Sequence, residues 1–417
     1  MKKKKLYLLT DGFPYGSGEK TFILPELEKL KDKFDVIIIA DINENMKYYS
    51  YLENVKVVPY FHERIRKIDA LKYMFSFLLF SGTWNDIKRM INRRLKIKKR
   101  LWKVFTFYIE AKKYRDWLDK NSVIDKEDDG IIYSYWYNQH VLAFTMEKDK
   151  YKKYKIITRA HGYDLYEEVT SSGWQPYKKY MDNKLDKVYF ISDYGKDYYE
   201  KRYLKTKKES SIVDKYEMAK LGAPGEEYWK CKSKNKQFIL FSCSNMIKLK
   251  RIDLIIGALA IINDFNIVWI HFGSGDLYES ILADAKEKLA NKKNIRFDFR
   301  GQVPNEEILN CYKIMQPSCF ITTSSSEGSP ISIQEALAYG IPIIGTKVGG
   351  IPELIDNNGV LLSENPTINE IAEAISKIYY SSQDEYLTYC KNSRKLWEHE
   401  YNQKENATKF LEKLVHL

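Results

Sequence analysis

The chain has 417 residues, more than one ordinary hydrophobic core supports, so we expect two domains of about 200 residues each. Its formal net charge is +12, and no apolar run is long enough to cross a bilayer. The lysine-rich start is interpreted as the lead-in to a buried strand, not as a signal peptide. Its cysteines are widely spaced without a CxxC pair, which argues against a disulfide framework or a zinc site and favours a reducing cytoplasm; they are Cys231, Cys243, Cys311, Cys319 and Cys390.

Apolar segments rich in β-branched residues alternate with longer segments of helical period along the chain. This alternation is typical of parallel sheets covered by helices, so we expect an α/β fold. In the first half, strands are predicted at 5–9, 36–40, 55–59, 130–133, 155–159 and 187–191. In the second half, they are predicted at 238–242, 265–272, 295–300, 319–322 and 342–345, with only helices beyond.

A basic segment interrupts the first half. Residues 61–115 hold sixteen Lys or Arg against four acids, and they include the aromatic and aliphatic run from Tyr73 to Phe80. We predict a helical insertion at about 61–117. Two interpretations stand: peripheral contact with an anionic membrane, or ordinary surface helices with a solvated basic face. Nucleic acid is a poorer partner, because no recognition fold is visible.

The two sets of strands are separated by Leu221-Gly-Ala-Pro-Gly225 and a lysine-rich stretch up to Gln237, which is interpreted as a linker. We therefore predict a first domain at 1–222, a second domain at 223–395 and a terminal helix at 396–417.

Two glutamates, Glu327 and Glu335, flank a predicted helix start in the second half. Ser329 suits an N-cap, Pro330 the first helical position and Gly340 the position just after the helix. A helix amino terminus at the carboxyl edge of a parallel sheet suits phosphate. Carboxylates placed there suit hydroxyls, so the pattern fits a ligand with a diphosphate, a ribose and a sugar.

The segment from Glu327 to Glu353 closely resembles the signature of family-four retaining glycosyltransferases, which have two facing Rossmann-like domains, the GT-B fold. The resemblance implies that 1–222 is the acceptor-side domain, that 223–395 binds the nucleotide sugar, and that the terminal helix crosses back to the first domain. The resemblance is closest in style to transferases of exopolysaccharide and colanic acid synthesis. It implies that Glu327 faces the donor sugar and that Glu335 binds the nucleotide ribose. It also implies that the backbone of Ser329, Pro330 and Ile331 contacts sugar and phosphate.

The segment Phe241 to Asp253 resembles the family's loop after the first strand of the donor domain, where an arginine and a lysine bind the diphosphate. Lys250 matches the lysine, but Asn245 stands in the place of the arginine. The resemblance therefore makes Lys250 the cation at the leaving group, with Arg251 compensating for Asn245. Taken alone, these residues also fit a solvated basic turn.

Further segments also resemble parts of the family's sequence. The glycine turn at Gly273 and the loop containing Gly16 and Gly18 imply donor contacts, and small residues there let backbone N–H groups approach an anion. His161, after a predicted strand, is implied to contact the donor sugar. Asp164 and Tyr166 are expected to face the acceptor.

These features predict a cytoplasmic transferase, at the inner face of the membrane if the basic insertion binds lipid, which moves a sugar from a UDP- or GDP-sugar to a saccharide or lipid-linked saccharide. The resemblance implies a retaining enzyme, and the absence of Asp-x-Asp agrees with catalysis without metal or cofactor. The alternatives are a non-catalytic accessory subunit, an epimerase or a phosphorylase on the same fold. The base, the sugar, the acceptor and the oligomeric state are left open.

Overall fold

In a computed structural model, the chain forms two compact units. The structure describes residues 3–16, 18–43, 46–48, 55–204, 214–227, 229 and 237–417. The first unit comprises Met1–Ala219 with Ala407–Leu417, and the second comprises Lys220–Asn406. Residues 228 and 230–236 of the predicted linker lie outside the described residues.

The first unit is built on a seven-stranded sheet with the order β3-β2-β1-β4-β5-β6-β7. All neighbouring strands are parallel. The strands are β1 Lys4–Thr10, β2 Phe34–Ile42, β3 Lys56–Phe61, β4 Gly130–Ser134, β5 Tyr154–Ala160, β6 Lys187–Phe190 and β7 Tyr216–Met218.

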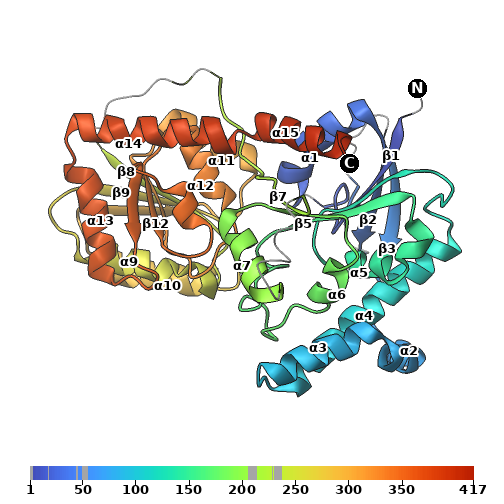
Figure 1. Cartoon of the computed structure of the whole chain (residues 1–417). Helices are drawn as coiled ribbons and strands as arrows, with labels where there is room; N and C mark the ends of the chain where they lie inside the picture. Colours follow the sequence, from blue (N-terminus) through green and yellow to red (C-terminus); the bar gives the residue numbers. More distant parts are fainter. Residues whose placement is uncertain are drawn as a thin grey trace. The chain divides into compact units, whose positions relative to one another are not determined.

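Helices connect these strands and cover the sheet (Figure 1). They are α1 Lys20–Lys33, α2 Lys67–Leu79, α3 Ser81–Asn92, α4 Ile97–Lys120, α5 Gln139–Met146, α6 Lys178–Asp182 and α7 Asp193–Tyr203. The predicted basic insertion is therefore helical, as α2, α3 and α4. The terminal helix α15, Gln403–Val415, ends in the first unit, where Phe410 packs against Tyr133 and Tyr189.

The second unit has a six-stranded parallel sheet with the order β10-β9-β8-β11-β12-β13. Its strands are β8 Phe238–Cys243, β9 Ile267–Phe272, β10 Ile295–Phe299, β11 Cys319–Thr322, β12 Ile343–Thr346 and β13 Gly359–Leu362. Its helices are α9 Ile252–Ile261, α10 Tyr278–Leu289, α11 Asn305–Met315, α12 Ile331–Ala338, α13 Ile368–Tyr380 and α14 Gln383–Leu396.

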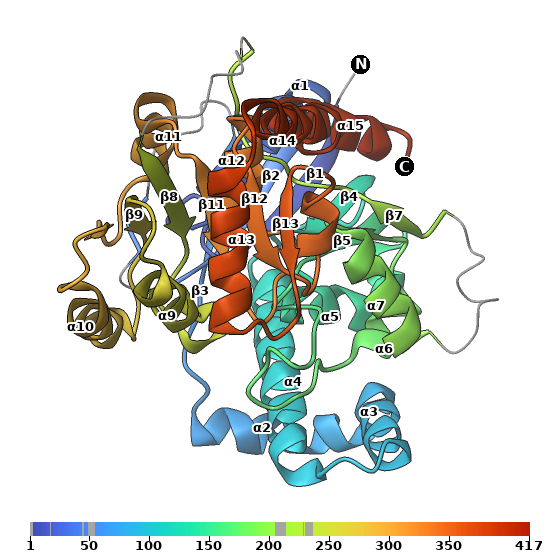
Figure 2. The same cartoon turned by 90° about the vertical axis from the view of Figure 1, so that its left-hand side faces the viewer.

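The central strands of this second sheet are buried on both faces, which explains why they are apolar at nearly every position, whereas the edge strand β10 exposes Arg296 and Asp298. In β8, Phe238 and Leu240 join the core under α9 and α13, whereas Ile239 and Phe241 join the core under α11 and α12. Figure 2 shows α9 and α13 in front of this sheet. The predicted α/β fold with two Rossmann-like sheets is confirmed.

The sequence did not predict β7 or β13. The expectation that only helices follow residue 345 was therefore wrong, because β13 follows it. Both are short edge strands with partly exposed residues, so they lack the apolar run that marks a central strand. The predicted start of α12 was wrong by one residue. Pro330 has ψ 119°, which is extended, so Pro330 is the N-cap and the helix begins at Ile331.

Candidate functional site

Ligands of open parallel sheets bind outside the carboxyl ends of the strands, at the point where the strand order reverses. In the second unit this point lies between β8 and β11. The loop after β8 carries Lys250, and the loop after β11 carries Glu327. The fold therefore brings these two predicted site residues to one edge of one sheet.

Lys250 and Glu327 are in direct contact. The Nζ of Lys250 donates a hydrogen bond to Oε1 of Glu327 at 2.5 Å, across 77 residues of sequence. The two side chains are only 19% and 12% exposed. A charge-assisted hydrogen bond between mostly buried groups is strong, so it holds the Lys250 ammonium group next to the Glu327 carboxylate.

The backbone of Glu327 is fixed by the glycines that follow β12. Gly350 donates its N–H to the carbonyl oxygen of Glu327 at 3.2 Å. Gly349 has φ +54°, and a Cβ there would lie 1.8 Å from the same oxygen. The close approach predicted for this loop is therefore made to Glu327 itself, and it requires glycine at position 349.

Glu335 lies inside α12 and is 2% exposed. Asn305, at the start of α11, donates its Nδ2 to Oε1 of Glu335 at 2.7 Å. Burial raises the pKa of Glu335 to about 7, and the hydrogen bond from Asn305 opposes that rise. A carboxyl group with this pKa changes its protonation state near neutral pH.

Ser329, Pro330 and Ile331 form the entry to α12, and all three are partly exposed. The Oγ of Ser329 accepts a hydrogen bond from Nε2 of Gln334 at 2.8 Å, so Ser329 orders this turn without capping the helix. The first amides of a helix have no intrahelical acceptor. They face the same loop as Glu327 and suit an anion.

Arg251 has a structural role that sequence reasoning did not predict. Its Nε donates to the carbonyl oxygen of Thr323 at 2.6 Å, and its Nη2 donates to that of Ser324 at 2.8 Å. The guanidinium also donates to an oxygen of each of residues 364 and 365. These bonds tie the loop after β8 to the loop after β11, so they position Lys250 opposite Glu327.

Asn245 and Gly273 lie in the loops after β8 and β9. The side chain of Asn245 is exposed. Gly273 has φ +131°, and a Cβ there would lie 2.0 Å from the carbonyl oxygen of Ser244. Close packing between the two loops therefore explains this glycine without a ligand.

In the first unit, His161 follows β5 and is 5% exposed. Its ring lies 4.2 Å from that of Trp136 and 5.1 Å from that of Tyr135, between centroids. Burial lowers the pKa of His161, although Asp164 opposes that effect, so the imidazole is neutral at pH 7. Within the described part of the chain, neither ring nitrogen has a hydrogen-bond partner, and Nδ1 is 3.6 Å from Asp164.

Asp164 and Tyr166 are buried, at 3% and 2% exposure, and their expected contact with an acceptor stays a prediction. Asp164 accepts the backbone N–H of Tyr137 at 2.8 Å and that of His161 at 2.7 Å. It therefore joins the loops after β4 and β5 and positions His161.

Sequence reasoning missed a polar cluster at the carboxyl edge of this sheet. Asp11, after β1, accepts hydrogen bonds from Asn138 at 2.7 Å and Tyr163 at 2.9 Å. Nε2 of His140 lies 3.2 Å from Asp41, at the end of β2. The signal was available, because these residues each come at or just after a strand end, but they are far apart in sequence.

The glycine-rich loop after β1 is held by Glu19. Its carboxylate accepts the N–H groups of Asp11 and Phe13 at 3.1 and 2.8 Å, and Nε1 of Trp136 at 2.5 Å. Gly18 has no described neighbour within 4 Å of a Cβ, and Gly16 only touches Met46 at 4.0 Å. Packing therefore does not require glycine at either position. Ser17 lies outside the described residues.

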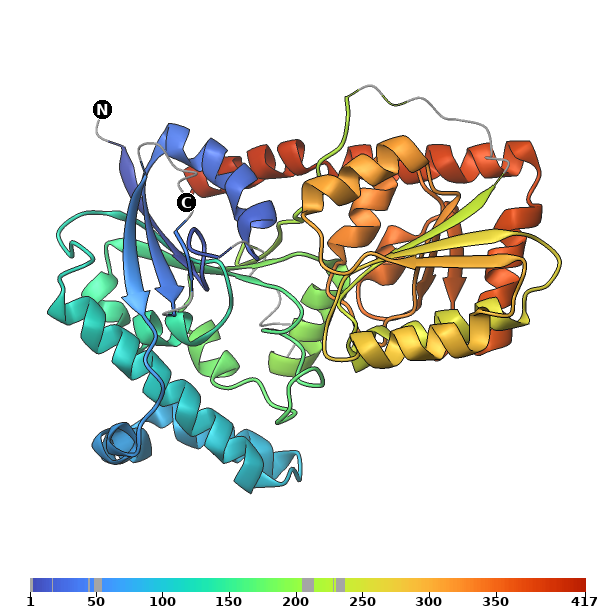
Figure 3. The ribbon, with the colours of Figure 1, turned by 180° about the vertical axis from the view of Figure 1, so that it is seen from behind.

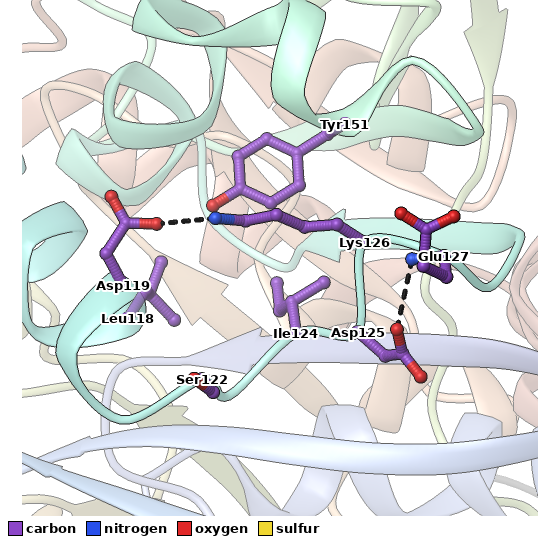
Figure 4. A pocket seen from close by; sticks show the side chains of 8 residues that line it. All are labelled: Leu118, Asp119, Ser122, Ile124, Asp125, Lys126, Glu127 and Tyr151. Atoms are coloured by element: carbon purple, nitrogen blue, oxygen red, sulfur yellow. Dashed lines mark hydrogen bonds and ion pairs between the residues drawn. The ribbon is translucent and has the colours of Figure 1, made fainter.

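A cavity of about 450 Å³ lies in the first unit at the opposite, amino-terminal edge of the sheet (Figure 4). It is lined by the end of α4, by the loop from Ser122 to Glu127 and by Tyr151. Its charges are paired: Lys126 bonds to Asp119 at 2.9 Å, while Asp125 and Glu127 lie near Lys5 and Lys153 outside the lining. None of the predicted site residues lines it.

Among the described residues, no three His, Cys, Asp or Glu side chains are grouped so that they could hold a metal ion. The four described cysteines are free, and Cys231 lies outside the described residues. None of the helices in the described ranges combines the length and the apolarity needed to span a membrane.

Comparisons with known proteins find a family match within the second unit. Residues 226–397 match the family model for glycosyl transferases group 1. WcaL of Escherichia coli (strain K12), named for glycosyl transfer in colanic acid biosynthesis, is 35% identical over 89 residues, which are 21% of this chain and 22% of WcaL. TuaC of Bacillus subtilis (strain 168), named for teichuronic acid biosynthesis, is 36% identical over 93 residues, 22% of this chain and 23% of TuaC.

These alignments span less than a quarter of each curated relative. The fold likeness covers both units. HepE of Anabaena, solved in complex with UDP, has a TM-score of 0.66 at 13% identity and covers 99% of this chain and 100% of its own. Residues 226–397 of this chain therefore form a domain of the glycosyl transferases group 1 family, within a chain of the GT-B fold.

Proposed function

We propose that this chain is a retaining glycosyltransferase that moves a sugar from a UDP- or GDP-sugar to a saccharide or lipid-linked saccharide. The observation that carries the proposal is the contact between Lys250 and Glu327 at the strand-order reversal of the second unit. A cation and a carboxylate held together there match a ligand that combines phosphate with sugar hydroxyls. The family match and the polysaccharide relatives support the same assignment.

Each residue has a task in this proposal. Lys250 and the first amides of α12 neutralise the diphosphate as it leaves. Glu327 accepts hydrogen bonds from the donor sugar, and Glu335 accepts them from the ribose diol. His161 is neutral and has both ring nitrogens unpaired, so it is proposed to contact the donor sugar. Arg251 acts as a positioning residue.

The proposed chemistry retains the anomeric configuration. The bond from the sugar to the diphosphate breaks as the acceptor oxygen approaches from the same face, and the leaving phosphate takes the acceptor's proton. Because Lys250 supplies the positive charge at the leaving group, we propose that the reaction needs no metal ion and no cofactor. We also propose that it takes place at the inner face of a membrane, in polysaccharide or glycoconjugate synthesis.

The proposal is tested with a panel of UDP- and GDP-sugars, by measuring donor hydrolysis and donor binding with and without EDTA. One donor should bind and turn over, equally well with EDTA. Glu327→Ala and Lys250→Ala should each lose activity by at least about a hundredfold, as expected for groups that stabilise a developing charge. Asp253→Asn, which removes an exposed carboxylate of the same unit, should keep full activity.

Absence of binding by every donor would exclude the transferase assignment and leave the accessory subunit as the alternative. Loss of activity in EDTA would contradict metal independence alone. A product with inverted configuration would contradict retention alone.

A further inference from the structure

Helix α2 exposes an apolar face to solvent. Its Leu71, Phe75 and Leu79 are 76%, 73% and 69% exposed, and Ile68, Met74 and Leu78 are exposed beside them. At 100° per residue these six positions cover one arc of the helix, with Lys67 within the arc at the first turn and Lys72 at its edge. We call these six residues the outer face of α2.

The opposite face of α2 is buried against its own unit. Tyr73 and Phe77 are buried, and Phe77 packs against Phe105 and Tyr108 of α4 at 4.8 and 5.5 Å between ring centroids. A surface helix needs one apolar stripe to dock on its own domain. The outer face is a second stripe, and intramolecular packing does not explain it.

The exposed charge within residues 64–109 has one sign, and the nearest exposed carboxylates outside that segment, Glu63 and Asp116, lie beside Lys113 and Lys72. Residues 64–109 contain thirteen Lys or Arg and only two acids, Asp69 and Asp86. Both acids are buried, Asp69 beside Lys113 and Asp86 beside Arg89. The exposed surface of this segment therefore carries cations and apolar groups but no carboxylate, whereas an ordinary solvated surface mixes both signs.

The two neighbouring helices share this character. In α3, Trp84, Lys88 and Ile91 lie on one exposed face at spacings of four and three residues. At the start of α4, Trp102 is exposed beside Lys98 and Lys99. Figure 3 shows α2 and the start of α4 projecting from the sheet of the first unit, and Figure 1 shows α3 at the same end.

We propose that the outer face of α2 inserts into the headgroup region of an anionic lipid bilayer, with the lysines of α3 and α4 bound to the lipid phosphates. An apolar stripe flanked by cations is what such an interface requires. A second copy of the chain fits poorly, because self-association through this face brings like charges together. The inference extends the proposed function, since it names the surface that places the enzyme beside a lipid-linked acceptor, but it does not depend on glycosyl transfer.

The test is sedimentation of the full chain with vesicles of phosphatidylcholine, with or without phosphatidylglycerol. Wild type should bind the anionic vesicles at least about tenfold more tightly, since each cation near such a surface contributes about fivefold. Leu71→Gln/Phe75→Gln should weaken this binding by at least about tenfold. Ile261→Gln/Ile314→Gln, an equally polar change at two exposed positions of the second unit, should leave it unchanged.

The charge contribution has its own matched pair. Lys98→Glu/Lys99→Glu should remove the preference for anionic vesicles, whereas Lys29→Glu/Lys33→Glu on helix α1 should keep it. The inference is overturned if wild type binds neither vesicle, or if Leu71→Gln/Phe75→Gln binds like wild type. It is also overturned if light scattering without lipid shows a dimer that this variant breaks. UDP binding, measured in the same lipid-free solution, tests the proposed function separately.

Discussion

The Lys250 ammonium group is bonded to the Glu327 carboxylate, although the proposed function requires it to bind a diphosphate. The carboxylate therefore competes with the phosphates for the same cation. Its benefit in the proposed reaction comes from its contacts with sugar hydroxyls, which a nucleoside diphosphate lacks. Binding of UDP and binding of a UDP-sugar should therefore respond differently when this carboxylate is neutralised.

We predict that Glu327→Gln tightens the binding of UDP about fivefold, which corresponds to about 1 kcal/mol from the released cation. The same change should abolish sugar transfer. Isothermal titration with UDP measures the first effect, and Asp253→Asn controls for a general loss of negative charge. Weaker UDP binding in Glu327→Gln would show that the ion pair holds Lys250 in place for the phosphates.

Glu335 makes the second unit sensitive to pH. Burial raises its pKa from 4.5 to about 7, so the folded protein retains a proton that the unfolded chain releases at lower pH. The stability gained from this proton is full below pH 4.5 and is lost as the pH rises through about 7. The ionised form is nevertheless the one that accepts hydrogen bonds from a ribose diol.

We predict that Glu335→Gln unfolds at higher temperature than wild type at pH 8, by a stability difference on the order of 3 kcal/mol, and that this difference shrinks towards pH 5. UDP binding to wild type should weaken as the pH falls below about 7. In Glu335→Gln, UDP binding should be weaker than in wild type at pH 8, and it should not show the loss caused by protonation of Glu335. The titration of the UDP phosphate affects both proteins equally. A parallel pH dependence in both would contradict the ribose role.

Sequence reasoning identified Lys250, Glu327 and Glu335 because each belongs to a continuous motif. It did not predict that Lys250 donates a hydrogen bond to Glu327, or that the Arg251 guanidinium donates hydrogen bonds to main-chain oxygens. Those facts depend on the register between β8 and β11, which no local pattern encodes. The polar cluster around Asp11 escaped for the same reason, since its members come from separate loops.

At the scale of elements, the loop after β12 determines where Glu327 lies. Gly349 and Gly301 both have left-handed backbones, with φ +54° and +65°. Only at Gly349 would a Cβ strike another atom, the carbonyl oxygen of Glu327, whereas nothing described lies within 4 Å at Gly301. Substitution of each glycine by alanine therefore distinguishes the cost of backbone strain alone from the added cost of a clash with Glu327.

We predict that Gly301→Ala costs about 1 kcal/mol of stability and leaves UDP binding unchanged. Gly349→Ala should cost clearly more and should also weaken UDP binding, because Glu327 and its loop must move. Thermal unfolding and titration calorimetry measure the two effects. Equal losses in both variants would mean that the contact with Glu327 adds nothing beyond the backbone angle.

The central strands could be predicted, because a strand buried on both faces is apolar at nearly every position. The edge strands β7 and β13 could not, since half-exposed strands of three or four residues carry too short a pattern. The start of α12 was misplaced for a conformational reason. Proline suits both the N-cap and the first helical position, and only its ψ angle decides between them.

At the scale of the whole molecule, each unit has cores of its own, and the chain returns to the first unit at its end. Two α/β units could be predicted from the two sets of alternating elements. The residue at which the chain returns to the first unit could not be predicted. The sequence of α15 has one amphipathic pattern from Gln403 to Val415, but only Ala407–Leu417 belong to the first unit.

Phe410 provides the test of that division. Its ring lies 4.1 Å from the guanidinium of Arg159, a fully buried group whose Nη1 donates to Glu26 at 2.6 Å. Phe410→Ala should therefore destabilise the first unit by about 3–5 kcal/mol, since it opens a cavity beside a buried ion pair. Val415→Ala, at an exposed position of the same helix, should cost less than about 0.5 kcal/mol.

Hydrogen exchange followed by mass spectrometry resolves the two units. In Phe410→Ala, peptides from β4 and β5 should lose protection, because Tyr133 of β4 and Arg159 of β5 contact the Phe410 ring. Peptides from β11 and β12 should keep wild-type protection, because their cores are formed within the second unit. Loss of protection in both sets would mean that the units unfold together, and α15, which begins in one unit and ends in the other, would then be the element that couples them.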